Sequence, residues 1–144
     1  TYFDMESNSP YMLNVVSVTE SRRKKLPPDF ESMDLWNKLY TQRSDIPGIT
    51  HLDFSARVQT VHKETNPRYW QLINAFKELT GYGLVVNTSF NVRGEPIVCT
   101  PHDAYRCFMS TEMDYLVIDD FVYCKVDQPN WQDKTAWRVK FDED

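Results

Sequence analysis

A segment in which a helix is marked at both ends constrains the fold of this chain more than any other part of the sequence. Residues 67–80 place an apolar side chain at every third or fourth position, which is the spacing of one helix face. Asn66 precedes this run as a cap, Pro67 suits the first helical position, and Gly81 follows as a stop. The sequence therefore predicts a helix over 67–80 with an apolar face in the core, formed by Tyr69, Leu72, Ile73, Phe76 and Leu79.

A short apolar run follows this helix and ends abruptly in polar residues. Residues 84–86 predict a buried strand, and residues 87–94 then combine amides, hydroxyls, one Arg and one Gly. Such side chains, together with exposed backbone N–H groups, bind phosphate oxygens at the end of a strand. An ordinary turn has the same composition, and the spacing matches no fixed phosphate-binding pattern, so residues alone leave both interpretations open.

A second segment, about thirty residues before this loop, has the period of two of a strand. From Ser55 onward, Ala56 and Val58 share one face, whereas Arg57 and Gln59 share the other. The polar face either lines a ligand groove or meets water, and the alternation fits both.

The other segments predict a mixed order of helices and strands, and so an α/β (mixed α+β) fold in a single domain. The predicted elements are a strand over 11–18, a short helix over 32–40, a helix starting at Pro101, and a hairpin of strands 115–118 and 121–126.

Two further features could attract anions or water. Residues 22–25 are four basic residues before two prolines, which predicts a solvated loop. The N-terminus of the helix that Thr100 caps attracts anions, but residues 96–99 separate it from the polar loop.

Composition excludes several classes of protein. With 41% hydrophobic and 14% aromatic residues the chain is not disordered, and a formal net charge of -5 argues against a nucleic-acid-binding surface. No apolar run is long enough for a membrane span, so we expect a soluble protein without a membrane partner. Three cysteines and three scattered histidines lack the spacing of a metal site, so no metal site is expected within the chain and a reducing cytoplasm fits best.

Three phrases resemble one protein family closely. They are THLDFSARVQTV at residues 50–61, ETNPRYWQLINAF at 64–76, and NTSFNVRGEPIVCTPHDAYRCF at 87–108. All three look like the C-terminal part of the O-carbamoyltransferases, which include nodulation protein U and the tobramycin, cephamycin and novobiocin carbamoyltransferases. The resemblance runs from Ser9 to about Lys125.

This resemblance implies a fold and a reaction. The fold is a twisted open sheet with flanking helices, similar to the YrdC-type threonylcarbamoyl-adenylate synthases, over residues 1–126; residues 127–144 would add a strand or an interdomain contact. Members of the family bind ATP with Mg²⁺ and carbamoyl phosphate in this part and form carbamoyl adenylate. A separate N-terminal domain of the actin-like ATPase fold, carrying a His-ligated metal, then passes the carbamoyl group to a hydroxyl of the acceptor.

The resemblance also assigns roles to individual residues. Arg57 matches a family Ser-Ala-Arg and would hold a phosphate or carbamoyl oxygen as a catalytic group. Ser89 would share that catalytic role, and Asn87 and Thr88 would join it in orienting the adenylate. Asn91 and Arg93 complete the predicted nucleotide-binding loop, with an ion pair that shapes the loop as the alternative for Arg93.

Two alternatives to this function remain open. Family members carry Lys- and Arg-rich phrases upstream of the point where this sequence begins, and these are expected to complete the triphosphate site. The chain alone is therefore expected to be inactive, and a non-catalytic nucleotide-binding or docking module is the main alternative. A threonylcarbamoyl-adenylate synthase is the other. The sequence identifies neither the acceptor, the pathway nor the oligomeric state.

Overall fold

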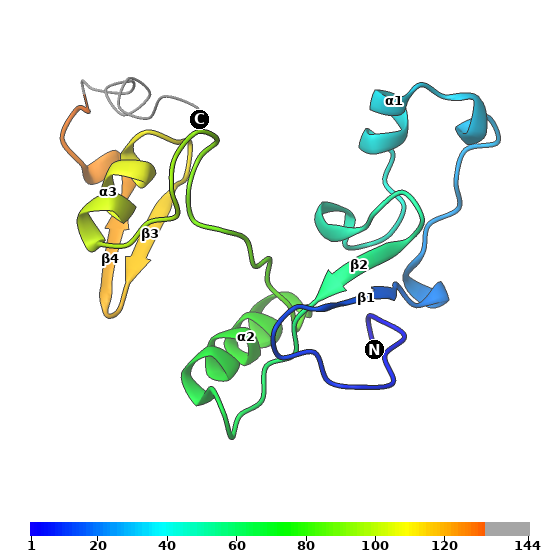
Figure 1. Cartoon of the computed structure of the whole chain (residues 1–144), viewed down its shortest axis with the longest axis horizontal. Coiled ribbons are helices and arrows are strands. Elements are labelled where there is room, and N and C mark those ends of the chain that lie inside the picture. The colour runs from blue at the N-terminus through cyan, green and yellow to red at the C-terminus, as the bar shows by residue number, and fades with distance from the viewer. Residues whose placement is uncertain (132–144) are drawn as a thin grey trace. The chain divides into compact units, whose positions relative to one another are not determined.

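Short helices and strands follow one another in mixed order along the chain in a computed structural model that describes residues 1–131 (Figure 1). The chain divides into two compact units, the first covering Thr1–Val86 and the second beginning at Asn87, and each is considered by itself. The described strands pair in two separate two-stranded antiparallel sheets, one in each unit. This mixed content confirms the predicted α+β class. The elements are β1 (Asn14–Ser17), α1 (Leu35–Tyr40), β2 (Ser55–Val58), α2 (Pro67–Thr80), α3 (Pro101–Met109), β3 (Tyr115–Ile118) and β4 (Phe121–Cys124).

The sheet of the first unit is the pair β1–β2, with Val15 opposite Arg57. The predicted alternation is confirmed, because Ala56 and Val58 are buried while Arg57 is exposed. Ala56 and Val58 form the core of the unit together with Val18 and Ile46. The first strand is shorter than the predicted 11–18, since the backbone turns just before it.

The ends of α2 are those that the sequence predicts, but its apolar face is not. The Asn66 side chain accepts a hydrogen bond from the backbone of Tyr69, and Gly81 takes the left-handed conformation with φ of 83°. Leu72, Phe76 and Leu79, however, are 55%, 40% and 87% exposed. The prediction of a core face was wrong for these residues. Helical spacing identifies an apolar face, but burial needs a second surface, and the described part of the first unit does not cover this one.

Residues 84–86 do not form the predicted strand. They run on from α2 without pairing to any described strand, and Val86 is 64% exposed. An apolar run of three residues becomes a strand only if a neighbouring strand accepts its backbone hydrogen bonds. The prediction failed because that neighbour is not encoded locally.

The second unit packs α3 against the β3–β4 hairpin. Thr100 caps α3, as the sequence predicts, and Asp103 in the first turn bonds back to Thr100. The core contains Phe108 of α3 and Leu116 of β3. The hairpin turns at Asp119, whose φ is 52°, and β4 ends at Cys124, two residues before the predicted end. The additional strand or interdomain contact predicted for residues 127–144 falls mostly on 132–144, outside the described residues.

A buried arginine fixes the approach to β2. Arg43 is 5% exposed, and its guanidinium donates five hydrogen bonds of 2.6–3.3 Å to backbone carbonyl oxygens. Three acceptors belong to Lys38, Leu39 and Thr41 at the C-terminal end of α1, where helix carbonyls lack partners. The other two are Thr50 and His51, just before β2. One side chain therefore joins the end of α1 to the segment that leads into β2.

The start of β2 is fixed by Asp53. Its Oδ1 accepts hydrogen bonds from the backbone N–H of Ser55 at 3.0 Å and from the Ser55 hydroxyl at 2.7 Å. Phe54 between them takes a left-handed φ of 62°. The Ser55 hydroxyl and then its N–H lower the pKa of Asp53 below the ordinary value of 3.8.

We expect Arg43→Lys to lower the free energy of unfolding by about 3 kcal/mol, because an ammonium offers three donors and leaves buried carbonyls without partners. Urea unfolding would measure the loss. Arg93→Lys, on an exposed side chain, is the control. Equal effects of the two substitutions would contradict the structural role of Arg43.

The acid dependence of stability tests the Asp53 contact. Because the pKa of Asp53 is lower in the folded state, its contribution is present above about pH 4 and is lost as the pH falls through the folded pKa. Asp53→Asn should therefore be less stable than the wild type at pH 7, and the gap should narrow toward pH 3.

Urea midpoints at several pH values would follow that gap, and the other carboxylates cancel because both proteins share them. Asp29→Asn is the matched control, since the Asp29 side chain caps no backbone N–H of the turn that follows it. A gap that stays constant with pH would refute the assignment.

Candidate functional site

The predicted site residues fall in both units. Arg57 lies on β2 of the first unit, whereas Asn87, Thr88, Ser89, Asn91 and Arg93 lie in the loop that opens the second. The structure therefore presents two partial sites, each with its own geometry.

Arg57 projects from the exposed face of the β1–β2 sheet. Its Nη2 donates to Sδ of Met12 at 3.4 Å, a weak acceptor. Within the described residues no carboxylate pairs with this guanidinium. Gln59, on the same face, donates to the carbonyl oxygen of Pro10 at 2.8 Å. Arg57 therefore keeps its charge and most of its five N–H donors for an external anion.

The polar loop of the second unit is folded on itself. Asn91 Nδ2 donates to the carbonyl oxygen of Glu95 at 2.8 Å, and the Val98 N–H donates to the Phe90 carbonyl at 3.0 Å. Gly94 provides the left-handed conformation, with φ of 85°, that the turn needs. Phe90 anchors the loop against the core of the second unit. Asn91 is thus a brace within the loop.

The ligand-binding candidates of this loop lie on its surface. Asn87, Thr88, Ser89 and Arg93 are all exposed. Their hydroxyl, amide and guanidinium groups are the types that bind phosphate oxygens, and the loop presents them to solvent. The braced turn beside them keeps the backbone in one shape.

The N-terminus of α3 carries its own anion. Asp103 Oδ2 accepts hydrogen bonds from the Thr100 hydroxyl at 2.7 Å and from the Thr100 N–H at 3.0 Å. The Thr100 hydroxyl is the main cause of a lowered pKa for Asp103. A carboxylate of the chain thus occupies the position at which the sequence predicted attraction of an external anion.

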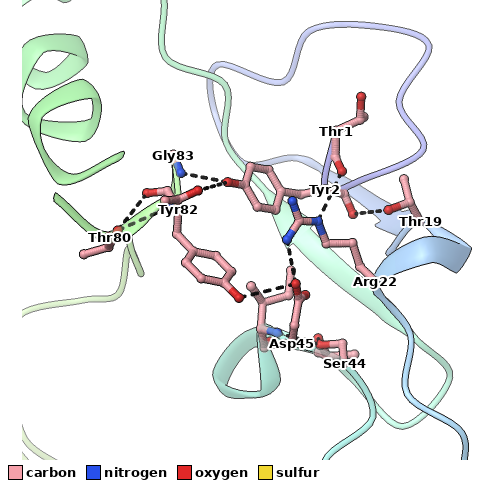
Figure 2. A network of polar contacts seen from close by, with 12 residues as sticks. Thr1, Tyr2, Thr19, Arg22, Ser44, Asp45, Thr80, Tyr82 and Gly83 are labelled. Carbon is pink, nitrogen blue, oxygen red and sulfur yellow. Dashed lines mark hydrogen bonds and ion pairs between the residues drawn. The ribbon is translucent and has the colours of Figure 1, made fainter. Parts of the chain in front are cut away.

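The prediction of a solvated loop at residues 22–25 was wrong for Arg22, which has partners within the chain. Arg22 Nη1 lies 2.6 Å from Asp45 Oδ2, and this bond is the largest cause of a raised pKa for Arg22 (Figure 2). Its guanidinium carbon lies 4.3 Å from the centre of the Tyr2 ring and 5.8 Å from that of Tyr82. Basic residues in a row indicate exposure only when no acidic or aromatic partner lies nearby in space.

The same network fixes the residues that follow α2. The Tyr2 hydroxyl accepts a hydrogen bond from the backbone N–H of Gly83 at 2.8 Å, and the Tyr82 hydroxyl reaches Asp45 at 3.5 Å (Figure 2). The chain leaves α2 in a fixed direction, four residues before Asn87 begins the polar loop. Sequence reasoning missed this network because its members are far apart in the chain and share no local pattern.

The described residues hold several other reactive groups. No group of three His, Cys, Asp or Glu within the described residues is arranged to hold a metal ion. Cys107 is buried, and burial followed by the charge of Glu95 raises the pKa of its thiol. A cavity of about 570 Å³ in the second unit has Met113, Tyr115 and Cys124 in its wall and includes no predicted site residue.

None of the helices in the described part is both long and apolar enough to cross a membrane.

Known proteins resemble the chain over most of its length. The chain is 56% identical over 143 residues to an uncharacterized protein, sll1178, of Synechocystis sp., covering 99% of this chain and 23% of that protein. It is 37% identical over 124 residues to nodulation protein NolO of Bradyrhizobium diazoefficiens, covering 83% of this chain and 23% of that protein.

A third relative is the 3'-hydroxymethylcephem-O-carbamoyltransferase of Amycolatopsis lactamdurans. Identity is 33% over 105 residues, covering 72% of this chain and 20% of the enzyme. The chain thus spans 20% to 23% of the length of these three relatives. A family model described as the carbamoyltransferase C-terminus matches residues 1–125, and the chain therefore belongs to this carbamoyltransferase C-terminal family.

Proposed function

We propose that this chain is the carbamoyl-activating part of an ATP-dependent O-carbamoyltransferase. It binds ATP with Mg²⁺ and carbamoyl phosphate and forms carbamoyl adenylate. An N-terminal domain of the actin-like ATPase fold, with its own metal, transfers the carbamoyl group to a hydroxyl of the acceptor. The observation that carries the proposal is the family match over residues 1–125, which includes every predicted site residue.

The chemistry of activation fits the residues that the chain exposes. Hydrolysis of carbamoyl phosphate releases phosphate and a carbamate; a carbamate oxygen then attacks the α-phosphorus of ATP, and pyrophosphate leaves. Negative charge builds on the phosphoryl oxygens, so the protein has to supply positioned donors and cations. Arg57 has the charge for this role and no carboxylate partner among the described residues.

The loop of the second unit carries the other candidate residues. Ser89 and Thr88 carry hydroxyls, Asn87 an amide and Arg93 a guanidinium, the groups proposed to orient the adenylate. Asn91 acts indirectly, since its amide is engaged with the Glu95 carbonyl within the loop. No described cluster of carboxylates is arranged for a metal, so Mg²⁺ would arrive on the ATP phosphates.

A docking module of the same fold is the second candidate function. The exposed apolar side chains of Leu72, Phe76 and Leu79 on α2 favour it, because such a surface is suited to contact with another protein surface. In that case the chain would bind its partner and no nucleotide. A threonylcarbamoyl-adenylate synthase, the third candidate, would show turnover that depends on threonine.

Removing a phosphate donor should weaken nucleotide binding and leave the fold intact. We expect Arg57→Ala and Ser89→Ala each to lower the affinity for ATP with Mg²⁺ by about 1 to 3 kcal/mol, the usual range for charge-assisted hydrogen bonds. Calorimetric titration, with and without carbamoyl phosphate, would measure the change.

Two exposed residues outside the proposed site provide matched controls for this titration. Arg68→Ala removes an arginine from α2, and Ser7→Ala removes a hydroxyl near the N-terminus. Wild-type binding that persists in both test variants would exclude Arg57 and Ser89 from the site. The absence of nucleotide binding by the wild type would favour the docking module only if the full-length protein also failed to bind ATP.

A further inference from the structure

A turn just before β1 holds a non-glycine residue in the left-handed region of backbone space. Met12 has φ of 56°, a conformation that costs an L-residue roughly 1 to 2 kcal/mol. Among the described residues, Phe54 before β2 and Asp119 in the β3–β4 hairpin are the other non-glycine residues with positive φ, and they too lie in turns. Met12 differs in lying beside Arg57, the first candidate for anion binding.

Hydrogen bonds hold this turn firmly against the end of β2. Ser9 is 3% exposed, and its N–H donates to the Thr60 hydroxyl at 3.0 Å while its carbonyl accepts from the Thr60 N–H at 3.0 Å. The Ser9 hydroxyl accepts from the Asn14 N–H at 3.3 Å, and its carbonyl also accepts from the Met12 N–H at 3.4 Å. Gln59 Nε2 donates to the Pro10 carbonyl at 2.8 Å. The turn is therefore built into the sheet and is able to support the costly conformation of Met12.

The side chain that this turn presents suits an arginine that must keep its charge. Met12 Sδ lies 3.4 Å from Nη2 of Arg57. A carboxylate in that place would orient the guanidinium but would neutralise it, whereas a thioether is an uncharged and weak acceptor. The contact restricts the side chain of Arg57 and leaves its charge available to a ligand.

We infer that the turn at residues 9–13 supports an oxyanion-binding arginine, with Met12 as the positioning residue that orients Arg57 toward a phosphate or carboxylate group. In the proposed reaction that group is an oxygen of ATP or of the carbamate, and to that extent the inference rests on the proposed function. An arginine that is ordered before the ligand arrives loses less conformational entropy on binding.

The test replaces the sulfur and keeps the apolar volume. In Met12→Leu we expect the affinity for ATP with Mg²⁺, and for inorganic pyrophosphate as a simpler probe, to fall about threefold to tenfold, the scale of one weak sulfur contact. Met113→Leu in the second unit is the matched control and should bind like the wild type. Thermal unfolding would verify that both variants fold.

A double-mutant cycle separates positioning from general destabilisation. In an Arg57→Ala background, Met12→Leu should cause no further loss of affinity, because the guanidinium that Met12 orients is already absent. Independent losses that add up would overturn the inference. So would an unchanged affinity in Met12→Leu while Arg57→Ala binds weakly.

A measurement without ligand distinguishes failure of the inference from failure of the proposed function. The Nε–H resonance of Arg57 in the wild type should show restricted motion in its heteronuclear NOE, and Met12→Leu should bring it to the value of freely moving arginines. Restricted motion with no binding of either probe would leave Met12 as the orienting residue and refute the nucleotide site. An Arg57 signal that is already mobile in the wild type would refute the positioning role itself.

Discussion

The structure of the first unit depends on a cation that is buried among carbonyl oxygens. A guanidinium inside a protein is stable only if its donors are satisfied, and Arg43 satisfies them with backbone carbonyls. The same bonds give partners to the last carbonyls of α1, which a helix cannot satisfy itself. The remaining bonds reach Thr50 and His51, so Arg43 also holds the segment that leads into β2, the strand that carries Arg57.

Local features of the fold could be predicted from the sequence because the residues that cause them are neighbours. Asn66 and Gly81 mark the two ends of α2 through hydrogen bonds within one helical turn, and Thr100 and Asp103 cap the start of α3 in the same way. The exposure of Arg57 follows from the alternation of β2 with buried Ala56. In each case the pattern and the interaction lie within a few residues of each other.

Features that require a distant partner could not be predicted in this way. The apolar face of α2 and the run at 84–86 look buried in sequence, but burial depends on which surface meets them. Arg22 looks like part of an exposed basic run, and its partner Asp45 lies 23 residues away. The contact of Met12 with Arg57 depends on a left-handed methionine, a conformation that no residue pattern indicates. For the loop at 87–93, the residue types indicated exposed polar groups, while the engagement of Asn91 with Glu95 was visible only in the structure.

The bond between Tyr2 and Gly83 has a consequence for the order in which the first unit folds. It joins residues 81 positions apart, and the network around it also needs Arg22, Asp45 and Tyr82. Tyr2 precedes Gly83 by 81 residues, so this bond cannot form before α2 has been synthesised. Until then the Tyr2 hydroxyl lacks the Gly83 N–H as a donor. Contacts between residues so distant in sequence form slowly, so closure of this network is expected to be a late event, and the direction in which the chain leaves α2 is fixed last.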